Sequence, residues 1–111
     1  LQNTDTSYPR YNIVENVDTG NYRIEVAIPG WSKEEIEVVQ EKNELLIKGK
    51  KEQKLGETER FVHQGLSLKS FERKFIMNTD LKVDFVELKD GLLTIALSRT
   101  PNSNRKVLDI K

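Results

Sequence analysis

Residues 83–97 read VDFVELKDGLLTIAL, in which two apolar runs are joined by Lys89-Asp90-Gly91. An Asp-Gly pair between two such runs is typical of a tight β-hairpin, because the turn needs positive φ angles that Gly adopts freely and Asp tolerates. The stretch therefore predicts two adjacent antiparallel strands, at 83–88 and 92–97.

Outward from this hairpin, short segments with an apolar residue at every second position recur along the chain. The clearest is 21–28 (NYRIEVAI), which Pro29-Gly30 ends because proline lacks a ladder donor. Trp31, directly after this turn, is expected to cover a sheet edge. The other predicted strands lie at residues 11–14, 36–39, 44–48, 60–63 and 70–77.

Helical signals are almost absent between these strands. Residues 32–35 (SKEE) could cap a helix, but they leave room for one turn at most before the next strand. About seven to eight short strands at regular spacing predict an all-β fold, an immunoglobulin-like antiparallel β-sandwich.

The stretch 50–59 (KKEQKLGETE) has one apolar residue, Leu55, among ten. Such a composition predicts a solvated loop that projects from the sandwich. Arg60-Phe61-Val62-His63 follows and alternates again, so we expect a strand carried on this loop.

The C-terminal stretch differs in kind from the rest. Residues 100–105 (TPNSNR) are polar and rich in turn-forming residues, which predicts a linker that ends the domain. Val107-Leu108-Asp109-Ile110 then forms a small apolar peptide. We expect it to dock into a groove or against another chain, because it has little core of its own to join.

The composition excludes several classes of function. Eighteen Lys and Arg balance 18 Asp and Glu over 111 residues, whereas a general nucleic-acid binder carries a basic surplus. The chain has no cysteine, which excludes disulfides and thiolate metal sites and favours a reducing compartment, so we expect a cytoplasmic location. No apolar run approaches the roughly 20 residues that span a bilayer. We therefore expect no nucleic-acid partner and no membrane span.

Residues suited to catalysis are scarce. His63 is the only histidine, so a Ser-His-Asp site would have to be built around it within the polar loop. The six glycines are scattered singly between strands, rather than gathered in a phosphate-binding loop. We expect no enzyme activity, no metal site and no cofactor, and a site around His63 is the alternative that stays open.

Five motifs occur in a fixed order along the chain. They are Tyr8-Pro9-Arg10-Tyr11-Asn12-Ile13, Ile28-Pro29-Gly30 with the following Lys33-Glu34-Glu35-Ile36-Glu37-Val38, Leu46-Ile47-Lys48-Gly49, Phe71-Glu72-Arg73-Lys74-Phe75 and Asp90-Gly91-Leu92-Leu93-Thr94-Ile95. Together they resemble the α-crystallin domain of small heat-shock proteins, most closely the bacterial class A, inclusion-body-binding type. The resemblance implies a remnant of an N-terminal arm at 1–10, the α-crystallin domain at 11–99 with a strand-swap loop at 50–65, and a C-terminal extension at 100–111 with an L-x-I tail motif.

The resemblance implies an ATP-independent molecular chaperone, a holdase that binds unfolding or aggregation-prone client proteins and prevents their irreversible aggregation. Such a protein assembles from dimers into larger oligomers, and ATP-dependent chaperones recover the clients downstream. The alternative is a co-chaperone or adaptor β-sandwich that binds one folded partner.

The resemblance also implies which residues join the protomers. A loop strand at 58–64 is exchanged into the partner and pairs with 11–14. Arg73 is expected to contact the partner through its planar guanidinium; the alternative is that it only screens a sheet face. The expected dimer interface is Tyr11, Asn12, Ile13, Val14, Arg60, Phe61, Val62, His63 and Arg73. The tail residues Leu108 and Ile110 are expected to fill a groove of a neighbouring protomer lined by Ile36, Val38, Val83 and Phe85.

Overall fold

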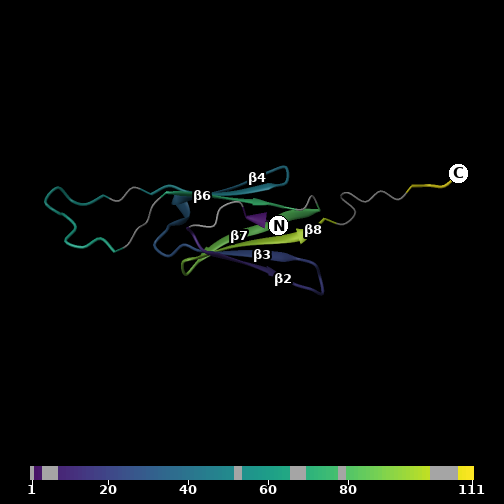
Figure 1. Ribbon diagram of the computed structural model, residues 1–111, viewed down its shortest axis with the longest axis horizontal. Helices are drawn as coiled ribbons and strands as arrows, with labels where there is room; N and C mark the ends of the chain where they lie inside the picture. The colour runs from purple at the N-terminus through teal and green to yellow at the C-terminus, as the bar shows by residue number, and fades with distance from the viewer. Residues whose placement is uncertain (1, 4–7, 52–53, 66–69, 78–79, 101–107) are drawn as a thin grey trace.

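The computed structural model describes residues 2–3, 8–51, 54–65, 70–77, 80–100 and 108–111. In these residues the chain forms two four-stranded antiparallel sheets that face each other as a sandwich (Figure 1). The strand order is β1-β6-β5-β4 in one sheet and β2-β3-β8-β7 in the other. The elements are β1 (Gln2–Asn3), β2 (Tyr11–Glu15), β3 (Tyr22–Ala27), the 3₁₀ turn η1 (Lys33–Glu35), β4 (Ile36–Glu41), β5 (Glu44–Gly49), β6 (Phe71–Ile76), β7 (Leu81–Lys89) and β8 (Leu92–Arg99).

The predicted all-β sandwich is confirmed, and so is the hairpin from which the prediction began. β7 and β8 pair antiparallel around Asp90 and Gly91, whose φ angles are 52° and 77°. Both angles lie in the left-handed region that favours Asp and Gly at such turns. The Ile28 N–H donates to the Gly91 carbonyl at 2.8 Å, so this turn also fixes the end of β3.

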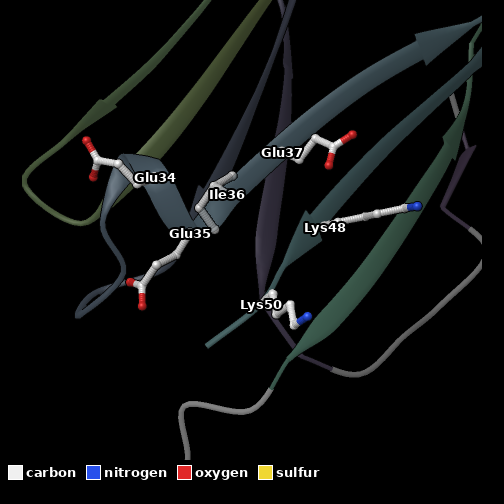
Figure 2. Close-up of a pocket in the computed structure, with 6 residues that line it drawn as sticks. All are labelled: Glu34, Glu35, Ile36, Glu37, Lys48 and Lys50. Atoms are coloured by element: carbon white, nitrogen blue, oxygen red, sulfur yellow. The ribbon is translucent and has the colours of Figure 1, made fainter. Parts of the chain in front are cut away.

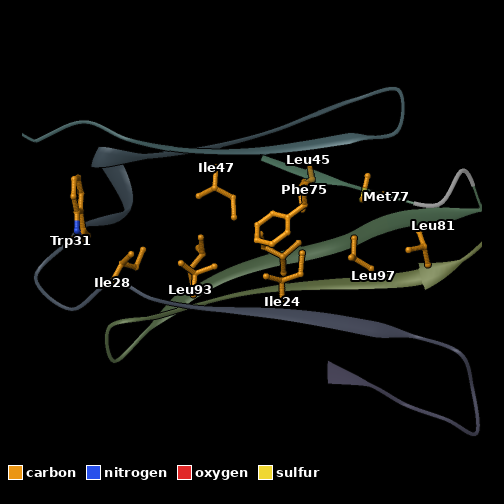
Figure 3. Packing of buried hydrophobic residues seen from close by; sticks show 12 residues of the cluster. Ile24, Ile28, Trp31, Leu45, Ile47, Phe75, Met77, Leu81, Leu93 and Leu97 are labelled. Carbon is orange, nitrogen blue, oxygen red and sulfur yellow. The ribbon is translucent and has the colours of Figure 1, made fainter. Parts of the chain in front are cut away.

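The core lies between the two sheets, where the alternating apolar residues of both inner faces meet (Figure 3). On β3 the inward positions are Ile24 and Val26, both fully buried, as the period-two pattern predicts. The buried cluster comprises Ile24, Val26, Ile28, Trp31, Leu45, Ile47, Phe75, Met77, Leu81, Leu93, Ile95 and Leu97. Trp31 is only 6% exposed, which confirms that it covers the sandwich at the turn after β3.

A β-bulge in β7 changes which residues of that strand face inward. Val83 pairs with Leu97, but the register then shifts, so that Phe85 pairs with Ala96 and Val86 with Ile95. Directly opposite residues of a ladder share a face, and Leu97 and Ile95 are core residues. The bulge therefore turns Val86 toward the inner side and Phe85 toward the outer side.

Two segments differ from the sequence prediction. The short strand β1 was not predicted; its backbone pairs Gln2 with Ile76 and Asn3 with Phe75 along the edge of β6. The predicted strand over 60–63 does not form in this single chain, in which the described loop residues 54–65 contain turns and coil but no strand. Alternation alone is not enough there, because a strand needs a neighbour to satisfy its backbone groups. In the described part of the chain, no helix is long and apolar enough to cross a membrane.

Candidate protein-interaction surfaces

The first candidate surface is the outer edge of β2. Among the described residues β2 pairs only with β3, from Tyr11 opposite Val26 to Glu15 opposite Tyr22. Its other side presents backbone donors and acceptors to solvent, which makes it a template for one more strand. Ile13 on this edge strand is 36% exposed.

Polar pairs along β2 and β3 flank this edge. Arg23 Nε lies 3.1 Å from Glu25 Oε2, and Asn12 donates to Glu25 Oε1 at 3.4 Å. These bonds, the one from Arg23 first, lower the pKa of the Glu25 carboxyl. At the other end of the strand pair, a hydrogen bond with Glu15 raises the pKa of the Tyr22 phenol.

Arg73 lies beneath this edge rather than on it. The side chain is fully buried on the inner face of β6, donates from Nη2 to the Pro9 carbonyl oxygen, and lies 5.0 Å from the centre of the Tyr11 ring. The Tyr11 ring in turn packs edge-on against Phe75, with centroids 5.1 Å apart. Within one chain, Arg73 occupies an inward position of its strand, and the segment leading into β2 covers it. Its expected contact with a partner stays a prediction.

The second candidate surface is the loop between β5 and β6, which extends away from the sandwich (Figure 1). Its described residues 54–65 expose three large apolar side chains, with Leu55 43%, Phe61 46% and Val62 95% exposed. His63 is exposed as well. The segment 60–63 thus offers apolar side chains and a backbone outside either sheet.

The third candidate surface is a groove of about 470 Å³ between the edges of β4 and β7, which we call the β4–β7 groove. Ile36 and Val38, which the sequence assigns to the tail-binding groove, belong to its lining, whereas Val83 and Phe85 do not. That the tail docks here stays a prediction. The bulge in β7 accounts for this lining, because it turns Phe85 outward and brings Val86 and Leu88 to the inner side instead. The full lining is Lys33, Ile36, Val38, Val86, Glu87, Leu88 and Leu93.

The two tail residues expected to bind this groove, Leu108 and Ile110, lie near the C-terminal end of the sequence. Leu108 is 72% exposed and Ile110 is 98% exposed. Neither side chain belongs to the core of its own chain.

A further hollow of about 440 Å³ opens beside η1 and the start of β4 (Figure 2). Its lining combines acidic and basic side chains with one apolar residue, and Glu37 stands directly opposite Lys48 in the β4–β5 ladder. The lining residues are Glu34, Glu35, Ile36, Glu37, Lys48 and Lys50. Over the described residues, no group of three or more His, Cys, Asp or Glu side chains could hold a metal ion.

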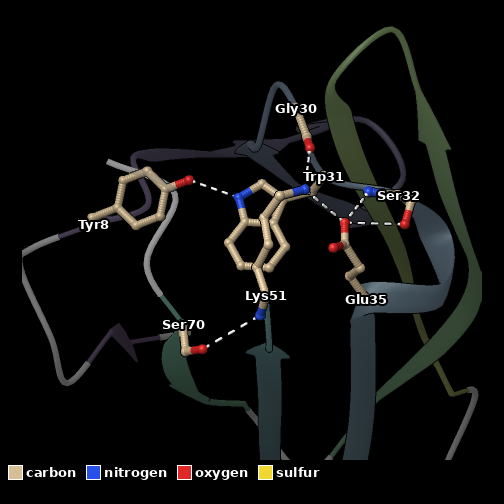
Figure 4. Close-up of polar contacts among 7 residues, drawn as sticks. All are labelled: Tyr8, Gly30, Trp31, Ser32, Glu35, Lys51 and Ser70. Carbon is tan, nitrogen blue, oxygen red and sulfur yellow. Dashed lines mark hydrogen bonds and ion pairs between the residues drawn. The ribbon is translucent and has the colours of Figure 1, made fainter. Parts of the chain in front are cut away.

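A cluster around Trp31 was not foreseen as a unit from the sequence (Figure 4). The indole Nε1 donates to the Tyr8 hydroxyl at 2.9 Å, and the ring packs edge-on against Phe71 with centroids 5.2 Å apart. Lys51 Nζ lies 5.4 Å from the centre of the same ring. The sequence does not predict these contacts, because Tyr8, Trp31 and Lys51 lie far apart along the chain and belong to no common motif.

Glu35 completes this cluster. Its Oε1 accepts from the Ser32 backbone N–H at 2.9 Å and forms an ion pair with Lys51 Nζ at 2.9 Å. These two partners, Ser32 first, hold the pKa of the Glu35 carboxyl below its usual value.

Over the residues that the structure describes, the two sheets form an eight-stranded antiparallel sandwich whose edge strands are β1, β2, β4 and β7. Such edges define a β-sandwich domain suited to protein–protein association. The family comparison is more specific: the model of the Hsp20/alpha crystallin family matches residues 14–111. The chain belongs to this family.

Curated proteins similar to this chain are named small heat shock proteins. Two curated relatives, each described as small heat shock protein IbpA, come from Yersinia pestis (strain Pestoides F) and Yersinia pseudotuberculosis serotype O:1b (strain IP 31758). Each is 37% identical over 92 residues, which cover 83% of this chain and 66% of the relative. The match thus spans slightly less than two thirds of the length of these relatives.

Solved structures agree with the fold. A small heat shock protein from Synechococcus phage S-ShM2 is 32% identical, with a TM-score of 0.70 over 95% of this chain and 99% of that one. Small heat shock protein AgsA from Salmonella typhimurium, in a C-terminally truncated form, is 25% identical, with a TM-score of 0.74 over the same shares.

Proposed function

We propose that this protein is an ATP-independent chaperone, a holdase that binds unfolding proteins and prevents their aggregation while it assembles from dimers into larger oligomers. The observation that carries the proposal is a complementary pair of open elements: the edge of β2 and the apolar loop segment 60–63. Membership of the Hsp20/alpha crystallin family and similarity to small heat shock proteins support it.

The dimer forms by exchange of the loop. Each chain offers a β2 edge with open backbone groups and a segment at 60–63 that pairs with no strand among the described residues of its own chain. Pairing the segment of one protomer with β2 of the other provides hydrogen-bond partners for the backbone groups of both. In a two-fold symmetric dimer this contact occurs twice. The pairing also buries part of the Phe61 and Val62 side chains, which are 46% and 95% exposed in the single chain.

Arg73 contributes to this interface from inside the sandwich, at the start of β2. Because its guanidinium holds the Pro9 carbonyl oxygen and lies over the Tyr11 ring, it fixes the position at which β2 begins. Its contribution to the dimer is then indirect, through the placement of the strand that receives the loop.

Larger oligomers form when the tail of one protomer docks into the β4–β7 groove of another. Leu108 and Ile110 are the apolar residues of the tail, and Ile36, Val38, Val86 and Leu88 provide an apolar lining in the groove. Burying two such side chains contributes roughly 3–6 kcal/mol before ordering costs. That is enough for an exchangeable contact, which suits an assembly that must open to expose surface to clients.

Client proteins bind the apolar surfaces that the exchange of subunits uncovers, and ATP-dependent chaperones recover them later. The cytoplasmic location expected from the sequence belongs to this proposal. His63, on the exposed loop, has no catalytic role in it.

The proposal is tested by heating an aggregation-prone enzyme with and without this protein and following light scattering. Suppression that rises with the molar ratio of protein to client, without added nucleotide, is the expected result. Unchanged scattering at several-fold molar excess contradicts the proposal. A matched sample with the Val62→Asp variant shows whether the exchanged loop matters for the activity.

A further inference from the structure

Both ends of the exchanged loop are fastened to the same place on the sandwich. At its start, the Lys50 N–H donates to the Glu35 carbonyl oxygen at 3.0 Å, and the Lys51 N–H donates to Ser70 Oγ at 3.4 Å. Ser70 lies at the other end of the loop, directly before β6 begins at Phe71. The bond between Lys51 and Ser70 therefore joins the two ends of the loop, and the bond from Lys50 ties its start to Glu35.

Lys51 makes the largest set of these contacts (Figure 4). Its ammonium donates to the Gly30 carbonyl oxygen at 2.7 Å and to Glu35 Oε1 at 2.9 Å, and it lies 5.4 Å from the centre of the Trp31 ring. The Lys51 side chain is 17% exposed, so it is more sheltered than a typical surface lysine. Isolated surface ion pairs contribute little, but here a backbone carbonyl and an aromatic face add to the pair.

Trp31 connects this anchor to the strand that receives the loop. Its indole Nε1 donates to the Tyr8 hydroxyl at 2.9 Å, and the Tyr8 ring packs edge-on against Phe71 with centroids 5.7 Å apart. Tyr8 lies three residues before the start of β2 at Tyr11. One aromatic ring thus holds both the base of the loop and the segment that leads into β2.

We propose that Lys51 is a positioning residue for strand exchange, which fixes the direction in which the loop leaves the sandwich through its contacts with Gly30, Glu35 and Trp31. The inference rests on the proposed function, because it assigns a role within loop exchange. A loop held at its base loses less conformational freedom when it pairs with the partner, so the anchor strengthens the dimer by pre-organisation.

A purely structural role for Lys51 has a different signature. If the residue only stabilises the sandwich, its loss lowers the urea midpoint of unfolding, and dimer affinity falls only as far as the fold is lost. A positioning role weakens the dimer while the sandwich unfolds at an unchanged midpoint. Trp31 is the only tryptophan in the chain, so its emission reports directly whether the anchor is intact.

The experiment measures the dimer dissociation constant of the full chain by sedimentation equilibrium, with urea unfolding of each variant alongside. Lys51→Met keeps an unbranched side chain over the Trp31 ring but removes the charge and the donors. We expect a rise of about tenfold in the dissociation constant, with shifted Trp31 emission. Lys50→Met, at the exposed neighbouring position, is the matched control and should stay within about twofold. Lys51→Arg, which keeps a cation and donors, should restore most of the affinity.

Two further outcomes separate this inference from the proposed function. If Val62→Asp weakens the dimer but Lys51→Met does not, loop exchange stands and the positioning role of Lys51 is overturned. If neither variant changes the dissociation constant, loop exchange itself is contradicted and the positioning role falls with it. A drop in dimer affinity that only parallels a lower urea midpoint also overturns the positioning role.

Discussion

Arg73 on β6 donates a hydrogen bond to the carbonyl oxygen of Pro9, 64 residues earlier in the chain, from a side chain that is fully buried. A buried guanidinium needs acceptors to offset its lost hydration. The Pro9 carbonyl and the face of the Tyr11 ring provide such an environment at the start of β2. The same residue therefore stabilises the sandwich and sets the position of its β2 edge.

Replacing Arg73 with alanine should lower the free energy of unfolding by about 2–4 kcal/mol, because it removes a charge-assisted hydrogen bond and leaves a cavity in the core. Urea denaturation measures the change. Arg23→Ala, at a side chain that is 51% exposed, is the control and should change the free energy by no more than about 0.5 kcal/mol. An Arg73→Ala variant as stable as the wild type would contradict the role given to this contact.

The bulge in β7 predicts that substitutions at two neighbouring residues have different effects on tail binding. Val86 lines the β4–β7 groove and Phe85 does not, although their exposed fractions, 43% and 54%, are similar. Val86→Asp should abolish binding of a labelled peptide with the sequence of residues 105–111, because a carboxylate in an apolar groove loses hydration. Phe85→Asp should leave binding unchanged. Fluorescence polarisation measures the binding of the peptide to both variants. If only Phe85→Asp loses binding, the tail contacts Phe85 rather than Val86, as simple alternation along β7 predicts.

Removing the apolar tail side chains should reduce the size of the assembly. Leu108→Ala with Ile110→Ala removes the two side chains proposed to dock, so the oligomers should shift toward dimers in light scattering coupled to size exclusion. The Asp109→Asn variant, which keeps both apolar residues, serves as the control. An unchanged mass for the double variant would mean that the tail does not connect the dimers, and a monomeric wild type would favour a folded-partner adaptor.

Acid should release the contact between Glu35 and Lys51. The pKa of Glu35 in the folded chain is below the ordinary value of 4.5, so its contribution to stability is complete above that value and is lost as pH falls through the lower, folded pKa. Trp31 emission, followed from neutral pH into this acidic range, should change as the ion pair is lost.

A matched pair of variants isolates this transition. Glu25 also has a lowered pKa, so wild-type data alone do not separate the two groups. Glu35→Gln should remove the acid-induced change in Trp31 emission, whereas Glu34→Gln, at the adjacent position, should retain it. If Glu35→Gln keeps the same transition, Glu35 is not the group that titrates.

The sequence predicted those parts of the fold that depend on local pattern. Asp90-Gly91 located the hairpin, and period-two alternation placed Ile24 and Val26 in the core, because turn dihedrals and strand faces are encoded within a few residues. The bulge between Val83 and Phe85 was missed, because one extra residue in a strand leaves the apolar run intact while it reverses the faces.

The remaining differences depend on contacts between distant segments. Gln2-Asn3 has no apolar alternation, and its pairing with β6 uses backbone groups that any sequence provides. The hydrogen bond from Arg73 to the Pro9 carbonyl joins residues 64 positions apart, so only the fold shows that this segment covers Arg73. The cluster that joins Trp31 to Lys51 links residues 20 positions apart through a turn and two strands, which local pattern cannot reveal.

Amide hydrogen exchange at several protein concentrations is the sharpest test of loop exchange, since it follows β2 and the loop without assuming a pairing register. If the loop is exchanged, the amides of 11–14 and 60–63 become protected together as concentration rises through the dimer dissociation constant, and Val62→Asp removes both effects. If the amides of 60–63 exchange as fast as those of an unstructured peptide at every concentration, the loop does not pair with β2 of a partner and the account is wrong.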